Sequence, residues 1–126
     1  MAFNGTWQMH SQENHEEFFK VMSMPDTVIR IMRDVKPLTE IQQTGDDFVV
    51  TVKTPLRSNT NTFTLGREAT INTFDGKKVK CTVNLEDGKL VCTTEKFTHV
   101  REIQGEEMVE TMTAGSTSMI RKSKRT

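Results

Sequence analysis

The sequence predicts an all-β protein in which ten antiparallel strands form an up-and-down β-barrel and two helices connect the first strand to the second. Three observations predict this fold. Helical spacing is confined to residues 14–34, the chain from residue 37 onward is rich in Thr, Val, Ile and Phe, and tight turns such as Asp75-Gly76 and Asp87-Gly88 separate its segments. The 126 residues suffice for one core, so we expect 1–126 to be a single domain.

The first strand is expected near residues 5–12, and two short helices follow it within residues 14–34. Asn14 and Glu17 have the spacing of a capping box, in which each side chain bonds the backbone N–H of the other residue. Pro25 ends the first helix and suits the first turn of the second. Neither helix is long enough to be stable alone in water, so both are expected to dock on the rest of the domain.

About nine strands are expected after the helices. The clearest is the segment 78–85, in which Val79, Cys81, Val83 and Leu85 alternate with polar residues. Short strands at intervals of roughly ten residues, joined by tight turns, indicate an antiparallel meander. A barrel is favoured over an open sheet because closure removes the exposed edge strands. The last three residues are expected to fray.

Charge and composition exclude several classes of function. Lys+Arg and Asp+Glu both number 17, so the chain lacks the basic excess that is usual in nucleic-acid-binding proteins. No apolar run exceeds three residues, which argues against a membrane span or a secretory signal and favours a cytoplasmic protein. Common catalytic motifs are absent, and His10, His15 and His99 have no metal-ligand spacing. We therefore expect a protein that is not an enzyme and holds no metal or cofactor.

Along the last three strands, charged side chains share a face with large apolar ones. The residues of these faces are Phe97, His99, Arg101 and Ile103, then Met108, Glu110 and Met112, then Met119 and Arg121. Two interpretations stay open. The charges lie in water on the outside, or they point into a cavity, since a barrel of about ten strands is wider than side chains alone fill. A charged, methionine-dotted interior suits an amphipathic anion, because Met adapts to apolar bodies and Arg binds carboxylates in a fixed fork.

Phe3-Asn4-Gly5-Thr6-Trp7 has the F-x-G-x-W pattern of intracellular lipid-binding proteins, and a helix pair followed by a β meander resembles that family along the whole chain. Further segments resemble its liver bile acid-binding branch, among them Gln12-Glu13-Asn14, Glu40-Ile41-Gln42-Gln43, Lys53-Thr54-Pro55, Asp75-Gly76-Lys77-Lys78, Gly88-Lys89-Leu90-Val91, Glu107-Met108-Val109-Glu110-Thr111 and Met119-Ile120-Arg121-Lys122-Ser123-Lys124. The resemblance implies a clam of two near-orthogonal sheets, lidded by the helices, with a large water-filled cavity. It also implies a cytosolic carrier of bile salts and fatty acids.

Two departures from the family bear on the ligand. The pI near 6.8 does not fit the basic members, and the chain has no Tyr, so the Arg-x-Tyr carboxylate pair of some members is absent: Ser123 stands two residues after Arg121. This favours bulkier or multiple ligands over one clamped fatty acid. Bile salts, with more than one in each barrel, are therefore the expected ligands, and a general long-chain fatty acid carrier is the alternative.

The expected ligand-binding set combines a few polar anchors with an apolar wall. Arg121 is the preferred partner for the anion of the ligand, the alternative being an exposed cation of a basic tail. His99 and Arg101 share a face, and Glu110 pairs with Arg121, accepts from a steroid hydroxyl or forms a structural ion pair. The remaining members of the set are Phe18, Met22, Met32, Phe63, Phe74, Met112 and Met119, with Thr54 and Thr73.

Cys81 and Cys92 flank the Asp87-Gly88 turn, and a short loop there points both thiols to the same face, directly opposite or diagonal by two. A disulfide that forms only under oxidising conditions is the hypothesis, because the cytosol disfavours such bridges. Two further partner expectations are open. The protein is expected to be a monomer. The cations Arg30, Arg33 and Lys36 steer anions to a portal, touch an anionic membrane or form a solvated helix face.

Two other classes of protein share some of these features. A secreted lipocalin shares Gly5-Thr6-Trp7, but the early helix pair and the missing signal speak for the intracellular branch. A structural coat protein of the same family would require a strongly basic surface, and this chain is neutral.

Overall fold

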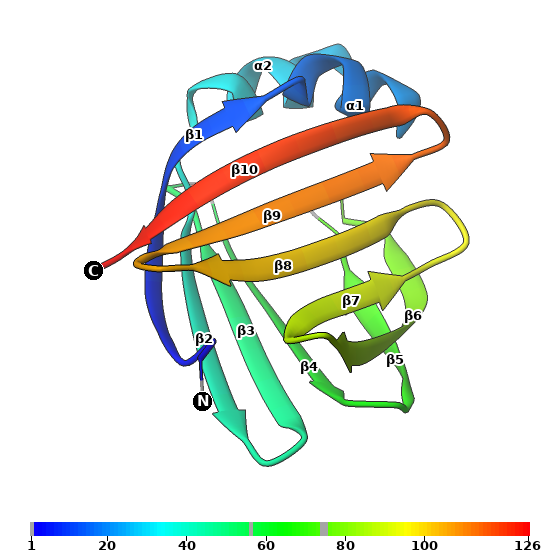
Figure 1. The fold of residues 1–126 in the computed structure, drawn as a ribbon. Coiled ribbons are helices and arrows are strands. Elements are labelled where there is room, and N and C mark those ends of the chain that lie inside the picture. The colour runs from blue at the N-terminus through cyan, green and yellow to red at the C-terminus, as the bar shows by residue number, and fades with distance from the viewer. Residues whose placement is uncertain (1, 56, 74–75) are drawn as a thin grey trace.

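The computed structural model describes residues 2–55, 57–73 and 76–126, and in these it contains ten strands and two helices (Figure 1). In chain order the elements are β1 (Gly5–Glu13), α1 (His15–Val21), α2 (Asp26–Asp34), β2 (Leu38–Thr44), β3 (Asp47–Lys53), β4 (Ser58–Thr64), β5 (Glu68–Asn72), β6 (Lys78–Glu86), β7 (Lys89–Thr93), β8 (Thr98–Gln104), β9 (Glu107–Ala114) and β10 (Thr117–Arg125). The predicted strand number and the position of the helix pair are confirmed.

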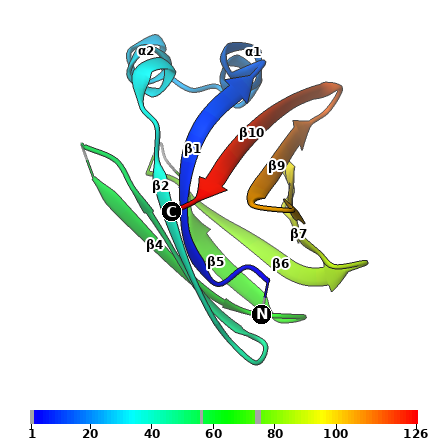
Figure 2. The ribbon, with the colours of Figure 1, turned by 60° about the vertical axis from the view of Figure 1, so that its left-hand side comes forward.

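All strand pairs are antiparallel, and the order in the sheet is β4-β3-β2-β1-β10-β9-β8-β7-β6-β5. Apart from β4 and β5, strands that follow one another along the chain are therefore neighbours in the sheet, and β10 returns to pair with β1. The sheet curls until its two edge strands, β4 and β5, come close to each other (Figures 1 and 2). The predicted barrel is confirmed, and within the described residues a backbone ladder joins every two neighbouring strands except β4 and β5.

Asparagine side chains bridge the gap between β4 and β5. The Nδ2 groups of Asn59 and Asn61 donate to the carbonyl oxygen of Asn72, at 2.8 and 3.2 Å. The backbone N–H of Asn72 donates in turn to Asn61 Oδ1 at 2.8 Å. These three residues, here called the amide seam, satisfy both backbone groups of Asn72 on the side of β5 that faces β4, where there is no ladder.

The helices cover one end of the barrel (Figure 1). α1 begins at His15 as predicted to within a residue, but the predicted capping box is wrong. Asn14 has φ 59° and makes no side-chain cap bond; its Nδ2 donates instead to the carbonyl oxygen of Ser118 at 2.8 Å. The left-handed conformation, which Asn tolerates better than most residues, turns that amide away from the helix and ties the lid to β10. No described helix is both long and apolar enough to cross a membrane.

Two apolar clusters build the interior. The first lies around Trp7, Phe48 and Met108 inside the barrel, and the Phe48 and Phe63 rings stack there with centroids 5.1 Å apart. The second lies beneath the lid, where Phe18 and Phe19 of α1 meet Met119 of β10. Because each cluster occupies one part of the barrel, space for a cavity remains between them.

The C-terminus is ordered, so the prediction of frayed final residues is wrong. β10 continues to Arg125, whose guanidinium lies 4.1 Å from the centre of the Trp7 ring and donates to the carbonyl oxygens of Ala2 and Asn4. The backbone N–H of Thr126 donates to Thr6 at 2.9 Å. Pairing with β1, together with cation–π stacking, holds the last residues in place.

Candidate ligand-binding cavity

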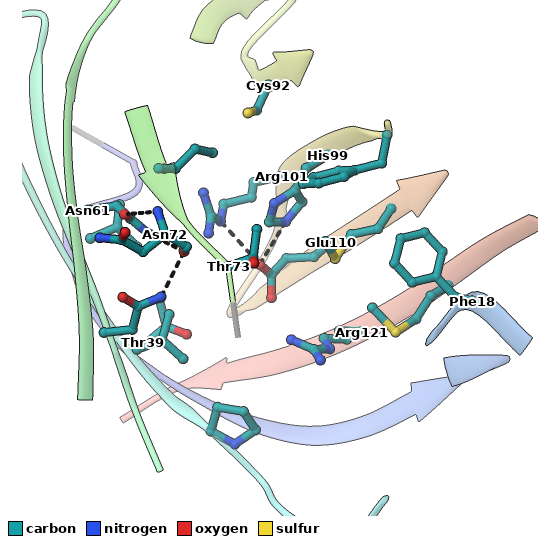
Figure 3. Close-up of a pocket in the computed structure, with 18 of the residues that line it drawn as sticks. Phe18, Thr39, Asn61, Asn72, Thr73, Cys92, His99, Arg101, Glu110 and Arg121 are labelled. Carbon is teal, nitrogen blue, oxygen red and sulfur yellow. Dashed lines mark hydrogen bonds and ion pairs between the residues drawn. The ribbon is translucent and has the colours of Figure 1, made fainter. Parts of the chain in front are cut away.

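A cavity lies between the barrel wall and the lid, and its space between protein atoms, mouth included, is about 1140 Å³. Most of its wall is apolar, with Phe18, Phe63, Met112 and Met119 among the lining residues. Polar side chains line it in two places: a charged cluster on β8, β9 and β10, and the amide seam on β4 and β5 (Figure 3). An amphipathic molecule suits such a lining, since large apolar surfaces with a few polar groups are typical of ligand sites.

The charged cluster consists of His99, Arg101, Glu110 and Arg121. Arg101 lies opposite Glu110 in the β8–β9 ladder, and Glu110 lies opposite Arg121 in the β9–β10 ladder. Alternation along each strand points these side chains inward with the neighbouring methionines. Both readings of these faces were open in the sequence; the structure places all four side chains in the cavity wall, where Glu110 is 7% and Arg121 6% exposed.

Glu110 is the centre of this cluster. Its Oε1 lies 3.0 Å from His99 Nε2 and accepts from Arg101 Nε at 3.1 Å (Figure 3). Burial alone would raise the pKa of Glu110, but the hydrogen bond from His99 and the charge of Arg101 outweigh it and hold the pKa well below its ordinary value. Glu110 is therefore an ionised carboxylate at neutral pH, with a structural ion pair to Arg101.

The cluster carries a net positive charge. Burial lowers the pKa of His99, and the charge of Arg101 lowers it further, so the ring is neutral near pH 7. Burial also lowers the pKa of Arg121, yet a guanidinium keeps its proton at neutral pH. Two cations and one carboxylate leave one positive charge in excess. These are the only charged side chains among the described residues that line the cavity.

The other residues predicted to bind the ligand have different positions. Phe18, Met22, Phe63, Thr73, Met112 and Met119 line the cavity. Met32 belongs to the core beneath the lid rather than to the cavity wall. Thr54 is also outside the wall, because its hydroxyl donates to the carbonyl oxygen of Arg57 and so closes the turn between β3 and β4. Phe74 lies outside the described residues.

Sequence reasoning missed several lining residues. Asn59 and Asn61 alternate with exposed residues along β4, and that alternation was the available signal. Thr39 and Ser123 are buried polar residues of the wall, at 5% and 2% exposure. Their small side chains give no charge or size pattern that distinguishes them from a surface position.

Cys81 and Cys92 are buried, free thiols on the same face, as predicted. Cys92 lies opposite Val83, two residues along β6 from Cys81, so the two are diagonal neighbours. A hydrogen bond between the thiols raises the pKa of Cys92 and lowers that of Cys81. Cys92 lines the cavity, and the disulfide that depends on oxidising conditions stays a prediction.

Comparisons with known proteins place this geometry in context. The model of the lipocalin / cytosolic fatty-acid binding protein family matches residues 1–126. The fatty acid-binding protein of liver from Schroederichthys bivius is 58% identical over 125 residues, which are 99% of this chain and 99% of that protein.

Two solved structures are similar over nearly the whole chain. A zebrafish ileal bile acid-binding protein complexed with cholic acid is 43% identical, with a TM-score of 0.88 and full coverage of both chains. A Schistosoma mansoni fatty acid binding protein in complex with arachidonic acid is 26% identical, with a TM-score of 0.94 and coverage of 99% of this chain and 96% of that one.

Proposed function

Because this chain belongs to the lipocalin / cytosolic fatty-acid binding protein family, we propose that it carries bile salts in its cavity, more than one per barrel, together with other amphipathic lipids. The family consists of lipid carriers, and this chain is a carrier rather than an enzyme. A cytoplasmic location is part of the proposal.

The observation that carries the proposal is the single positive charge in excess inside an apolar-walled cavity. A guanidinium binds carboxylates and sulfonates through strong charge-assisted hydrogen bonds, so the anionic group of a ligand gains from entering the cluster beside Arg121. Contact of about 200 Å² of steroid surface with the apolar wall contributes roughly 5 kcal/mol before the cost of association. The apolar wall therefore supplies most of the affinity, and the charge orients the ligand.

Bile salts fit better than a single fatty acid for two reasons. The charged cluster and the amide seam give the apolar cavity polar groups in two separate places, which suits a steroid that carries hydroxyl groups as well as an anionic group. The position two residues after Arg121 holds Ser123 rather than Tyr, so no phenol helps to clamp one carboxylate. The similar protein with cholic acid supports this choice.

The alternative is a general carrier of long-chain fatty acids. The relative from Schroederichthys bivius is named as a fatty acid-binding protein, and the similar Schistosoma mansoni protein binds arachidonic acid. Arg121 suits a carboxylate of either ligand class, so the polar cluster alone does not discriminate between them.

Calorimetric titration of the delipidated protein distinguishes the two. We expect a conjugated bile salt to bind with more than one site and more tightly than oleate. Arg121→Gln should weaken the bile salt about tenfold or more, because it removes a charged hydrogen-bond donor. The matched control Arg67→Gln changes an exposed arginine outside the cavity wall and should bind as the unaltered protein does. Tight one-to-one oleate binding with weak bile-salt binding would reject the bile-salt assignment.

We also propose that the carrier is a monomer that touches anionic membranes transiently through its lid. Val21 of α1 and Ile31 of α2 are 51% and 46% exposed, and Arg30 is exposed beside Ile31. An apolar pair with adjacent cations suits the surface of an anionic bilayer. Sedimentation equilibrium tests the monomer. Ligand transfer to vesicles tests the contact: Arg30→Glu should slow transfer to anionic vesicles and leave transfer to neutral ones unchanged.

A further inference from the structure

β6 has a ladder partner on both sides only at Thr82. It pairs with β5 over Lys78–Thr82 and with β7 over Thr82–Glu86. After Thr93 the chain leaves β6, and the Thr94 hydroxyl accepts the backbone N–H groups of Lys96 and Phe97 to form a tight turn before β8. On the β7 side, the segment from Lys78 to Cys81 is therefore an unpaired strand edge.

The direction of the backbone groups shows which of them are free. Val83 accepts from the backbone N–H of Gly66, so the carbonyl of Val83 points toward β5. Successive residues of a strand direct their backbone groups to opposite sides, so Lys80 directs its N–H and C=O toward the unpaired side. No backbone partner for either group exists among the described residues. A second strand would satisfy both.

A groove with about 1020 Å³ of space between protein atoms, its opening included, lies along this edge, between β6 and the turn after β7. Three exposed lysines, Lys78, Lys80 and Lys96, line it together with the exposed Glu68 and Glu95. The side chains of these five form no ion pair and no hydrogen bond with another described residue, since Lys96 bonds Thr94 only through its backbone N–H. The groove therefore has one positive charge in excess and free cations beside a free strand edge.

The lysines decide which strand fits. Pairing with a second copy of this chain through the same edge would place Lys78 and Lys80 against their own counterparts, and like charges on paired strands repel. An acidic strand would have carboxylates beside these cations, about 5 Å away across the ladder. The inward face of the edge carries Val79 and the buried Cys81, so the partner strand needs apolar residues at its alternate positions.

We propose that the edge Lys78–Cys81 of β6 binds an extended segment of another protein, with alternating acidic and apolar residues, by β-strand addition. The main chain of that segment continues the sheet at the place that β7 leaves, and its carboxylates pair with the lysines of the groove. The described residues that line this groove include none from α1 or α2, so the site is apart from the lid.

Two synthetic peptides test the proposal, acetyl-Val-Glu-Val-Glu-Val-amide and acetyl-Val-Lys-Val-Lys-Val-amide. The readout is amide hydrogen exchange of the isotope-labelled full chain by NMR. We expect the acidic peptide to slow exchange of the Lys80 amide about tenfold and the basic peptide to leave it unchanged. The effect should weaken several-fold between low and high salt, because exposed charges carry it.

Charge reversal supplies the second measurement. In Lys78→Glu/Lys80→Glu, we expect the basic peptide to protect the amide of residue 80 and the acidic peptide to lose its effect. The control Lys124→Glu changes an exposed lysine at the end of β10 and should keep the preference for the acidic peptide. Oleate or bile-salt binding reports that each variant is folded. Equal protection by both peptides, no protection by either, or dimerisation of the chain instead would overturn the proposal.

Discussion

The substitution Glu110→Gln tests the charge arrangement of the cavity directly. The side chain keeps its size but loses its charge, so the contacts at 3.0 Å to His99 and 3.1 Å to Arg101 lose their ionic partner. The buried cluster then carries two positive charges in excess instead of one. Removing one member of a buried ion pair costs about 3–5 kcal/mol, because the remaining charge stays desolvated.

Urea unfolding at pH 7, followed by circular dichroism, measures this cost. With a slope of about 1.5 kcal/mol per molar urea, the midpoint should fall by about 2–3 M while the slope stays unchanged. The matched control is Glu107→Gln on the same strand. The Glu107 carboxylate is 35% exposed and lies 3.7 Å from His10, so its loss should cost less than about 1 kcal/mol.

A double variant makes the reasoning refutable even if the single variant barely folds. Glu110→Gln/Arg101→Met removes both charges of the ion pair and returns the cluster to one positive charge in excess. We expect it to be more stable than Glu110→Gln alone. Two results would show that charge balance does not govern the stability of the cluster. One is an equal loss of stability in Glu110→Gln and Glu107→Gln, and the other is a double variant that is less stable than Glu110→Gln alone.

The same groups set the acid sensitivity of the protein. The pKa of Glu110 is held below its ordinary value of 4.5, so its contribution to stability is complete above that pH and is lost as the pH falls through the lower folded value. The pKa of His99 is also lowered, from 6.5, so the unfolded chain binds the proton more readily and stability falls below pH 6.5 as well. The stability difference between the unaltered protein and Glu110→Gln should therefore shrink below pH 4.5.

Three further predictions concern the frame of the cavity. Asn61→Ala should lower the free energy of unfolding by about 1–2 kcal/mol in urea titrations, because the Asn72 N–H loses its acceptor. The control Asn72→Ala removes a side chain that makes none of the bonds of the amide seam. It should lower the free energy of unfolding by less than half as much. Cys81 and Cys92 should both titrate with a thiol reagent under reducing conditions and fall below two free thiols after oxidation; two free thiols in air-oxidised protein would contradict the conditional bridge. Gly5→Ala should lower the melting temperature by several degrees, because φ is 134° there and a Cβ would collide with the Arg125 guanidinium that stacks on Trp7. An unchanged melting temperature would show that Arg125 moves aside at no cost.

Local alternation predicted much of this protein. It assigned Glu110 and Arg121 to faces shared with methionines, and Pro25 divided the helix pair correctly. Pairwise partners could not be predicted in the same way, because they depend on the register between strands. Glu110 lies opposite Arg101 as well as Arg121, and the sequence offers no means of choosing which contact forms.

Features that need the closed barrel were also beyond the sequence. The amide seam forms because β4 and β5, the two edges of the sheet, meet side by side without a ladder. From the sequence alone, Arg125 belongs to a basic tail at the end of the chain. In the structure β10 lies beside β1, and the Arg125 guanidinium covers Trp7. The sequence predicts Asn14 as a helix cap, but in the docked lid its side chain donates to the carbonyl oxygen of Ser118 instead. In each case a contact between distant parts of the chain overrode the local preference.

The order of the strands is a cyclic shift of the order of the sequence, and the point of the shift is the amide seam. Read from β5 through β10 to β1 and on to β4, the sheet is a continuous meander. The chain therefore runs directly from β4 to β5, where no ladder joins the strands. Its two ends lie in β1 and β10, which a backbone ladder does join. A circular permutant that joins the present termini and opens that turn would retain every strand pair of the barrel.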